Sequence, residues 1–405
     1  MTSPTEPMTS YANFFDRDPF PFFEVIRSQG RAVWDEGMNA WLVTGYDDVA
    51  HVQRHEEIFL APWPRMNFEP IFGRRTLFMI EGEPHRRMYG KIAQFFSKAV
   101  IEDYRVRFIR PLVAARLDRI APTGRAELAA QFAQELPVRV IGSMLGVPWQ
   151  DEQLGHDVWE WTSGFLAHTG TWILPSAGQD TQAAAEASMG RLDDLLRPLV
   201  RRGAIEDPTS YIARLWEYGP DVYPDWDERD VLENCRFLFI AGVHTTTELL
   251  CNAIYAILST PGLEARLRAD RSQLVPFIEE VLRLSPSMHV RMRLVGEDTT
   301  IGDVQLLAGQ RVLTITAAAN RDPDHFRIPD EMDLERRPIS DHLTFNRGPR
   351  SCSGAPLARV EAYEAIDGLL DRVEDLQFDP SQPAPINEGF LQRQFRPLHA
   401  TFTAR

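Results

Sequence analysis

The sequence predicts a mainly α-helical protein with small β-sheets. Residues 101 to about 215 show the apolar periodicity of helices, and residues 227–259 have the pattern of one helix of roughly nine turns that ends before a Pro–Gly pair. No internal repeat or long linker divides the chain. We therefore expect one domain over residues 1–405, with residues 1–17 as a loosely ordered N-terminal segment. Short strand patterns lie at residues 32–34, 40–44, 288–293 and 398–402.

Composition and charge exclude several classes of protein. The 405 residues include 43 Lys and Arg against 58 Asp and Glu, and the net charge of −15 argues against nonspecific nucleic-acid binding and docking on anionic lipid. The three cysteines are far apart and form no Cys-x-x-Cys pair, which argues against a disulfide framework and a zinc site and favours a reducing cytoplasm. The first ten residues are polar, so we expect neither a signal peptide nor a membrane anchor.

The N-terminal part alternates short elements. Residues 18–27 have an apolar helical face, two strands follow around a polar turn, and residues 46–52 begin a helix with acidic side chains in its first turn. Residues 61–73 contain three prolines and several large apolar side chains. This stretch predicts a loop rather than a helix, folded over a ligand or simply packed on itself as an Ω-loop.

The long helix is unusual at its centre. Residues 237–241 are apolar in every direction, which predicts a centrally buried helix. Gly242 and the β-branched residues 245–247 make a poor helix interior, so we expect a distortion that frees threonine hydroxyls to bond groups other than the backbone. Further on, Glu280 and Arg283 are three residues apart and therefore lie on one helix face, as many surface pairs do.

The most informative stretch is residues 345–359, a loop that presents one cysteine and then becomes a helix. Gly348 and Gly354 allow a close backbone approach, and Pro349 restricts the loop. Cys352 stands just before the helix, where the helix dipole favours its thiolate. A thiolate on a glycine-rich loop suits a metal or a haem iron.

This loop resembles the cytochrome P-450 signature Phe-x-x-Gly-x-Arg/His-x-Cys-x-Gly. Asn346 departs from the pattern, since the family usually has a second glycine there. The resemblance implies a haem b with Cys352 as the iron ligand and the other four matching residues around the cofactor; a buried free cysteine in a Gly/Pro loop is the alternative. The residues that match, with the same spacing, are Phe345, Gly348, Arg350, Cys352 and Gly354.

Similarity to the family extends in order from about Asp18 to Phe402, and no membrane anchor of the microsomal members is recognisable. It implies the triangular fold with helix-rich and sheet-rich lobes and a monooxygenase that hydroxylates or oxidatively dealkylates a substrate. Electrons are expected from a separate ferredoxin and its reductase. A haem-thiolate enzyme for isomerisation, coupling or nitration, and a noncatalytic haem sensor, are the alternatives.

Several residues match family elements that contact haem. The stretch 81–91 resembles a helix that gives a histidine and an arginine to a haem propionate: His85 fits, and Tyr89 stands at the arginine position. Arg293 resembles another propionate ligand, and strand alternation puts Arg291 on the same side. Ala241 and Gly242 match the helix that lines the cofactor.

The same helix carries the expected catalytic residues. Thr245 matches the oxygen-activating threonine of the family motif Ala-Gly-x-Asp/Glu-Thr-Thr, and His244 replaces the acid. Glu248 follows one turn later, so we hypothesise that a His244–Glu248 pair relays protons to Thr245. Alternatively, His244 hydrogen-bonds substrate or has no role.

Two further elements have counterparts in the family. Glu280 and Arg283 match a buried pair joined by a later arginine, with Arg336 and Arg337 as candidates. The segment 335–361 is locally basic and, with two lysines, forms a candidate docking face for an acidic ferredoxin. The basic residues concerned are Lys91, Lys98, Arg336, Arg337, Arg347, Arg350 and Arg359.

The substrate pocket is expected to be mainly apolar and aromatic. A small or medium hydrophobic organic molecule is therefore the expected substrate, and Arg65, His289, Arg291 and Gln392 are candidates for a polar or anionic anchor. The predicted pocket residues are Trp63, Phe72, Phe237, Ile240, Ala241, His289, Val290, Phe390 and Leu391.

Overall fold

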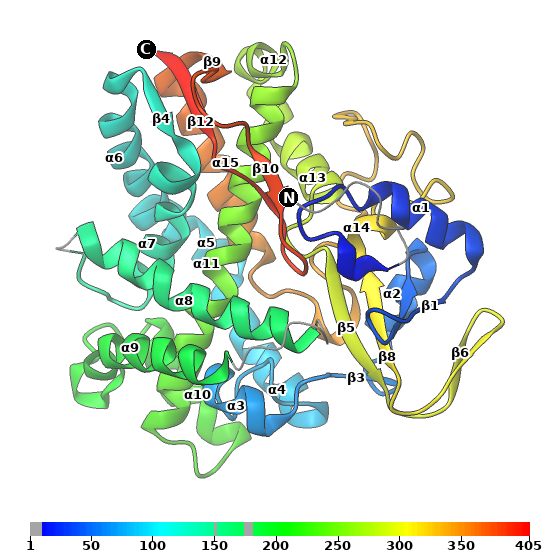
Figure 1. Cartoon of the computed structure of the whole chain (residues 1–405). Coiled ribbons are helices and arrows are strands. Elements are labelled where there is room, and N and C mark those ends of the chain that lie inside the picture. The colour runs from blue at the N-terminus through cyan, green and yellow to red at the C-terminus, as the bar shows by residue number, and fades with distance from the viewer. Residues whose placement is uncertain (1–9, 150–151, 174–180) are drawn as a thin grey trace.

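The computed structural model describes residues 10–149, 152–173 and 181–405. Most helices gather on one side of the molecule and the largest sheet lies on the other (Figure 1), which confirms the predicted mainly α-helical fold with small β-sheets. The α-helices are α1 Phe20–Gln29, α2 Tyr46–Arg54, α3 Arg65–Phe72, α4 Gly82–Ile92, α5 Lys98–Tyr104, α6 Arg110–Ile120, α7 Glu135–Met144, α8 Glu152–Ile173, α9 Gln182–Val200, α10 Tyr211–Val222, α11 Glu228–Ser259, α12 Leu263–Ala269, α13 Leu274–Leu284, α14 Thr316–Ala319 and α15 Ala355–Arg372. The strands are β1 Val33–Asp35, β2 Ala40–Val43, β3 Phe59–Leu60, β4 Arg125–Glu127, β5 Val290–Val295, β6 Thr299–Ile301, β7 Val304–Leu306, β8 Arg311–Ile315, β9 Val373–Phe378, β10 Ile386–Glu388, β11 Gln394–Arg396 and β12 His399–Ala404.

Helix α11 runs through the middle of the molecule (Figure 1). Asp227 and Asp230 form a capping box at its start, in which each carboxylate accepts from the backbone N–H of the other residue. The helix packs against α7, α8, α9 and α15, and most of its side chains are buried. It is long and apolar enough to cross a membrane, but 78% of its apolar stretch is buried inside the protein. The predicted bounds and central burial are therefore confirmed.

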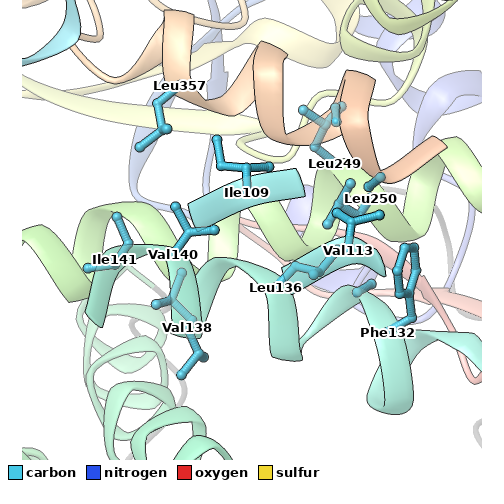
Figure 2. Close-up of a cluster of buried hydrophobic side chains, with 14 of the residues drawn as sticks. Ile109, Val113, Phe132, Leu136, Val138, Val140, Ile141, Leu249, Leu250 and Leu357 are labelled. Carbon is cyan, nitrogen blue, oxygen red and sulfur yellow. The ribbon is translucent and has the colours of Figure 1, made fainter. Parts of the chain in front are cut away.

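One apolar cluster connects α11 with the helix that follows the cysteine loop. Figure 2 shows Leu249 and Leu250 of α11 close to Val113 of α6, while Leu357 of α15 lies near Ile109 in the same cluster. Because Leu357 is only five residues after Cys352, this packing holds the end of the cysteine loop against the core.

The largest sheet has the strand order β1-β2-β8-β5-β3. Strand β5 is antiparallel to β8, with Arg291 opposite Thr314 and Arg293 opposite Val312. Successive side chains on a strand point to opposite faces, so Arg291 and Arg293 share one face and the buried Met292 points to the other. A three-stranded sheet, β4-β12-β9, and the pairs β6-β7 and β10-β11 complete the strands.

The N-terminal segment differs from its prediction where the structure describes it. Residues Tyr11–Asn13 form a short 3-10 helix, and the buried Tyr11 hydroxyl donates to the carbonyl of Phe390 at 3.0 Å. The guanidinium of Arg393 donates to the carbonyls of Phe14 and Arg17. The expected loose order is therefore wrong for residues 10–17, because partners almost 380 positions away hold them. Residues 1–9 lie outside the described residues.

The proline-rich stretch 61–73 also differs, because Arg65–Phe72 form α3. Pro64 precedes the helix, where its missing N–H costs no helical hydrogen bond. Pro70 leaves the carbonyl of Met66 without its usual helical donor, and the side chain of Gln182 on α9 approaches that carbonyl at 3.5 Å. A contact between helices thus compensates for a proline that predicted a loop.

Candidate active site

Backbone hydrogen bonds fix the position of Cys352 in its loop. Its N–H donates to the carbonyl of Phe345 at 2.8 Å, its carbonyl accepts the N–H of Ala355 at 3.4 Å, and the backbone N–H groups of Gly354 and Ala355 at the start of α15 lower the pKa of its thiol. Gly348 has a φ of +74°, and a Cβ there would lie 2.8 Å from the Cα of Arg54. Only glycine satisfies both conditions without moving α2, so the loop geometry depends on this residue.

The side chain of Cys352 is exposed, and its thiol is nevertheless desolvated. The residue is exposed, yet burial raises the pKa of its thiol, against the opposing effects of two backbone N–H groups and of Arg291. Both conditions hold for a side chain that faces space enclosed by the protein rather than bulk water. The nearby guanidinium and the N–H donors stabilise the thiolate form that a metal requires.

The centre of α11 shows a second exposed position inside the protein. Ala241 is exposed although its neighbour Ile240 is buried, and a Cβ on Gly242 would lie 2.8 Å from Ile141 of α7. Thr245 Oγ1 donates to the carbonyl of Ala241 at 2.9 Å. The predicted distortion is therefore wrong in this structure: α11 is continuous, and this hydroxyl bonds the backbone as threonines in helices commonly do.

A group of donors and cations lies beside the cysteine loop. His85 is buried, and burial together with the charge of Arg350 lowers its pKa to about 4. Its Nδ1 has no hydrogen-bond partner within the described ranges. Burial, Arg350 and Arg291 lower the pKa of Arg293 to about 10. Arg350 itself donates to Glu56 at 2.7 Å and to two backbone carbonyls.

These residues fit a haem. A haem presents an iron that needs an axial ligand, an apolar ring, and two propionates that need cationic donors. Cys352 supplies the thiolate, and Ala241 presents a small side chain for close approach. The orphaned Nδ1 of His85 and the desolvated guanidinium of Arg293 supply propionate donors.

Two predicted haem contacts already have protein partners. The hydroxyl of Tyr89 lies 3.0 Å from the hydroxyl of Ser351, so Tyr89 supports the cysteine loop in this structure. Arg291 donates to Thr316 Oγ1 and to the carbonyl of Thr344, and burial lowers its pKa to about 10. Arg291 is therefore held towards Cys352.

The proposed His244–Glu248 pair is wrong. The Nε2 atom of His244 lies 3.0 Å from Thr162 Oγ1 on α8, and Trp159 covers the ring with the two ring centres 4.2 Å apart. The Thr162 hydroxyl already points to backbone carbonyls of α8, so His244 Nε2–H is the donor. Burial lowers the pKa of His244 to about 3 and raises the pKa of Glu248. Among the described residues, His244 is held by α8 and not by Glu248, because the packing of α8 and not helical spacing sets the orientation of its ring.

The Glu280–Arg283 pair is buried, as the family resemblance implied. Arg283 donates to both carboxylate oxygens of Glu280, at 2.7 and 2.8 Å, and Arg336 adds a third bond at 3.0 Å. This settles the choice between the two candidate arginines, since Arg337 donates only to a backbone carbonyl among its described contacts. The pair joins α13 to the segment leading into the cysteine loop.

The predicted pocket residues divide into two apolar groups. Phe72, Phe237 and Ile240 pack with Phe68 and Phe165, whereas Val290, Phe390 and Leu391 pack with Tyr11 and β8. Trp63 contacts both groups. His289 lies beside the second group: it is buried with its ring 6.1 Å from that of Phe20, and its backbone bonds Leu391 and Ala317 before β5 begins. Its assignment to the pocket stays a prediction.

Sequence reasoning missed residues whose partners are distant. Phe78 packs between Phe72, 4.3 Å away, and Phe237, 6.0 Å away. The apolar run 77–80 directly after the proline-rich stretch was a usable signal for it. Thr162, the partner of His244, had no such signal, because its role depends on how α8 crosses α11.

The fold and this set of donors define a haem-thiolate enzyme. A family model described as Cytochrome P450 matches residues 223–397. The chain is 32% identical over 378 residues to Cytochrome P450 monooxygenase PikC from Streptomyces venezuelae, covering 91% of this chain and 86% of that protein. It is 33% identical to Mycinamicin IV hydroxylase/epoxidase from Micromonospora griseorubida, covering 88% of each.

Solved structures agree with these relatives. P450BioI, in complex with an acyl carrier protein that carries hexadec-9Z-enoic acid, has a TM-score of 0.86 at 24% identity and covers 97% of this chain and 100% of its own. HmtN, a post-tailoring hydroxylase of himastatin biosynthesis, has a TM-score of 0.80 at 27% identity and covers 98% and 100%. The chain belongs to the cytochrome P450 family and is a monooxygenase. Haem b and dioxygen are what this family uses.

Proposed function

We propose that Cys352 is the axial ligand of haem b and that the protein inserts one oxygen atom into a hydrophobic organic substrate. The observation that carries this is the cysteine itself: its side chain is exposed, burial raises the pKa of its thiol, and two backbone N–H groups and the Arg291 guanidinium lower that pKa. With haem bound, the site would supply dioxygen activation. The overall reaction would place one atom of dioxygen in a C–H bond of the substrate and release the other as water, consuming two electrons and two protons.

The protein's own residues would bind, orient and exclude water. His85 and Arg293 would hold the propionates, Arg350 would fix the cysteine loop through its bonds to Glu56 and two carbonyls, and Phe345, Gly348 and Gly354 would shape the space beside the thiolate. Ala241 and Gly242 allow close approach of the ring to α11. Thr245 Oγ1 is the hydroxyl that we assign to proton delivery, supported by its place one turn after the exposed Ala241 on α11 and by the match to the family threonine.

Substrate is proposed to lie between the two apolar groups that Trp63 connects. Phe72, Phe237 and Ile240 form one wall, and Val290, Phe390 and Leu391 form the other. Such walls favour a small or medium hydrophobic molecule for hydroxylation or oxidative dealkylation. Two relatives are named as a mycinamicin IV hydroxylase/epoxidase and a C-19 steroid 1alpha-hydroxylase, which supports an organic substrate for hydroxylation. A substrate-induced spin-state shift in the haem spectrum is the screen.

Electrons are proposed to come from a separate ferredoxin and ferredoxin reductase in the cytoplasm. Solved P450 chains cover 95–99% of this chain, which supports one haem-binding domain over residues 1–405. The docking face is less basic than its sequence implied. Four of its five arginines bond carboxylates, and Lys91 bonds Asp221. We therefore propose docking in which shape contributes more than charge.

The test of the central assignment is Cys352→His. This variant should keep some haem but lose the carbon-monoxide difference band of a thiolate-bound ferrous iron. Cys235→Ala is the matched control: Cys235 is buried on α11, and its variant should keep the band. If the unmodified, folded and reduced protein lacks the band, the assignment fails. Incorporation of labelled dioxygen into product separates monooxygenation from isomerisation or coupling.

A further inference from the structure

One buried carboxylate holds both ends of the cysteine loop. Glu279 on α13 is 3% exposed and accepts from Arg359 Nε at 2.6 Å, Arg359 Nη2 at 3.0 Å and His342 Nε2 at 3.1 Å. His342 lies ten residues before Cys352, and Arg359 lies seven residues after it. Both flanks of the loop are therefore bound to one side chain of a different helix.

The protonation of this network follows from its geometry. The N–H of Thr344 donates to His342 Nδ1 at 3.3 Å, so Nε2 carries the ring proton and donates to Glu279. Burial lowers the pKa of His342, which keeps the ring neutral. Although burial opposes it, hydrogen bonds from His342 and Arg359 lower the pKa of Glu279. The network thus contains one carboxylate and one guanidinium, with balanced charge.

Arg359 connects the network to the cysteine in two ways. Its guanidinium lies 4.5 Å from the ring centre of Phe345, whose carbonyl accepts the N–H of Cys352 at 2.8 Å. Its charge is also close enough to Cys352 to lower the pKa of that thiol. Glu279 therefore determines both where this cation stands and how much of its charge the sulfur experiences.

We propose that Glu279 is a positioning residue that, with His342 and Arg359, sets the electron donation of Cys352 and hence the haem reduction potential. The inference rests on the proposed role of Cys352 as iron ligand. Without the carboxylate, the positive charge of Arg359 would be unbalanced and would draw electron density from the Cys352 sulfur. The sulfur would then donate less to the iron, which favours the ferrous state. Without the guanidinium, the carboxylate charge would be unbalanced and would favour the ferric state.

The test is a pair of variants with opposite expected signs. Glu279→Gln keeps the size of the side chain and should move the potential of the haem-loaded protein to a more positive value. Arg359→Met keeps the packing on Phe345 and should move it to a more negative value. We expect each to change the ferric–ferrous equilibrium about threefold to tenfold, where tenfold is about 59 mV for one electron. The double variant Glu279→Gln, Arg359→Met should return towards the wild-type potential.

Glu364→Gln is the matched control. Like Glu279, Glu364 is a buried carboxylate bonded by arginines, here Arg105 and Arg110. It belongs to α15 and lies five residues beyond Arg359. Its variant should lose stability without a comparable change in potential. A purely structural role for Glu279 would instead shift both single variants in the same direction, or no further than this control, and either result would overturn the proposal.

The carbon-monoxide band separates this inference from the function on which it rests. Absence of the thiolate band in wild type would remove the iron-ligand assignment and the inference together. A normal band with potential shifts of equal sign would remove the inference alone. Failure of both single variants to bind haem would also overturn it, because the network would then be required for folding rather than for tuning.

Discussion

Replacing His244 with glutamine should flatten the acid sensitivity of the protein. His244 is 2% exposed, is covered by Trp159, and donates from Nε2 to Thr162. Burial lowers its pKa to about 3. A glutamine amide can donate to the same hydroxyl but does not titrate, so the change removes the proton equilibrium and keeps the hydrogen bond.

The size of the effect follows from linkage. A histidine with a pKa near 6.5 when unfolded and about 3 when folded binds a proton only in the unfolded state between these two values. Its stabilising contribution is therefore complete above pH 6.5 and is lost as pH falls towards 3. At about 1.4 kcal/mol per pKa unit, lowering the pH from 7 to 5 should cost about 2 kcal/mol through His244 alone.

The measurement is urea unfolding of wild type and His244→Gln at pH 7, 6 and 5. The wild type should lose about 2 kcal/mol more than the variant between pH 7 and 5. Comparing the two proteins at each pH removes the contributions of other histidines and of haem loss. His156→Gln, at an exposed position on α8, should behave as wild type. Parallel pH dependence in wild type and His244→Gln would refute the buried, neutral state of His244.

The other predictions concern the loop, the buried ion pair and the docking face. Gly348→Ala should reduce haem incorporation, measured as haem per protein, because its φ of +74° and a Cβ 2.8 Å from the Cα of Arg54 force the loop to move. Arg283→Met should lower the free energy of unfolding by about 3–5 kcal/mol, since it leaves the buried Glu280 with one arginine; a loss below 1 kcal/mol would contradict a buried pair. The rate of electron transfer from ferredoxin should fall no more than about threefold from low to physiological salt, because most proximal arginines are already paired; a steep fall would show an electrostatic interface. Tyr89→Arg should make the electron-transfer rate more dependent on salt, because it adds an unpaired positive charge to the docking face.

The sequence predicted the elements whose signals are local. The nine-turn helix was located almost to the residue. An acidic cap marks its start, an apolar run marks its middle, and a Pro–Gly pair follows its end. The Glu280–Arg283 pair followed from spacing together with the family pattern. The match of Phe345, Gly348, Arg350, Cys352 and Gly354 was strong because loop geometry constrains each residue type.

Predictions failed where a distant partner decides the conformation. Helical spacing allowed His244 to meet Glu248, but α8 brought Thr162 to the imidazole instead. Proline content argued against a helix at 65–72, but the side chain of Gln182 on α9 approaches the carbonyl that Pro70 leaves without its usual helical donor. The N-terminal residues lack a strong local pattern, and Arg393 fixes them from the other end of the chain.

The charge balance around the cysteine loop gives a reason to expect a further anionic group there. Arg291 and Arg293 are desolvated, and the hydrogen bonds described for them go to hydroxyl or carbonyl oxygens rather than to carboxylates. Desolvated cations are costly unless an anion compensates them. The Cys352 thiolate can balance one such charge, and iron would then share that charge. One further anionic group would balance the charge that remains, and a haem carboxylate would supply it, so the arginines of β5 favour a haem over a metal ion bound by the thiolate alone.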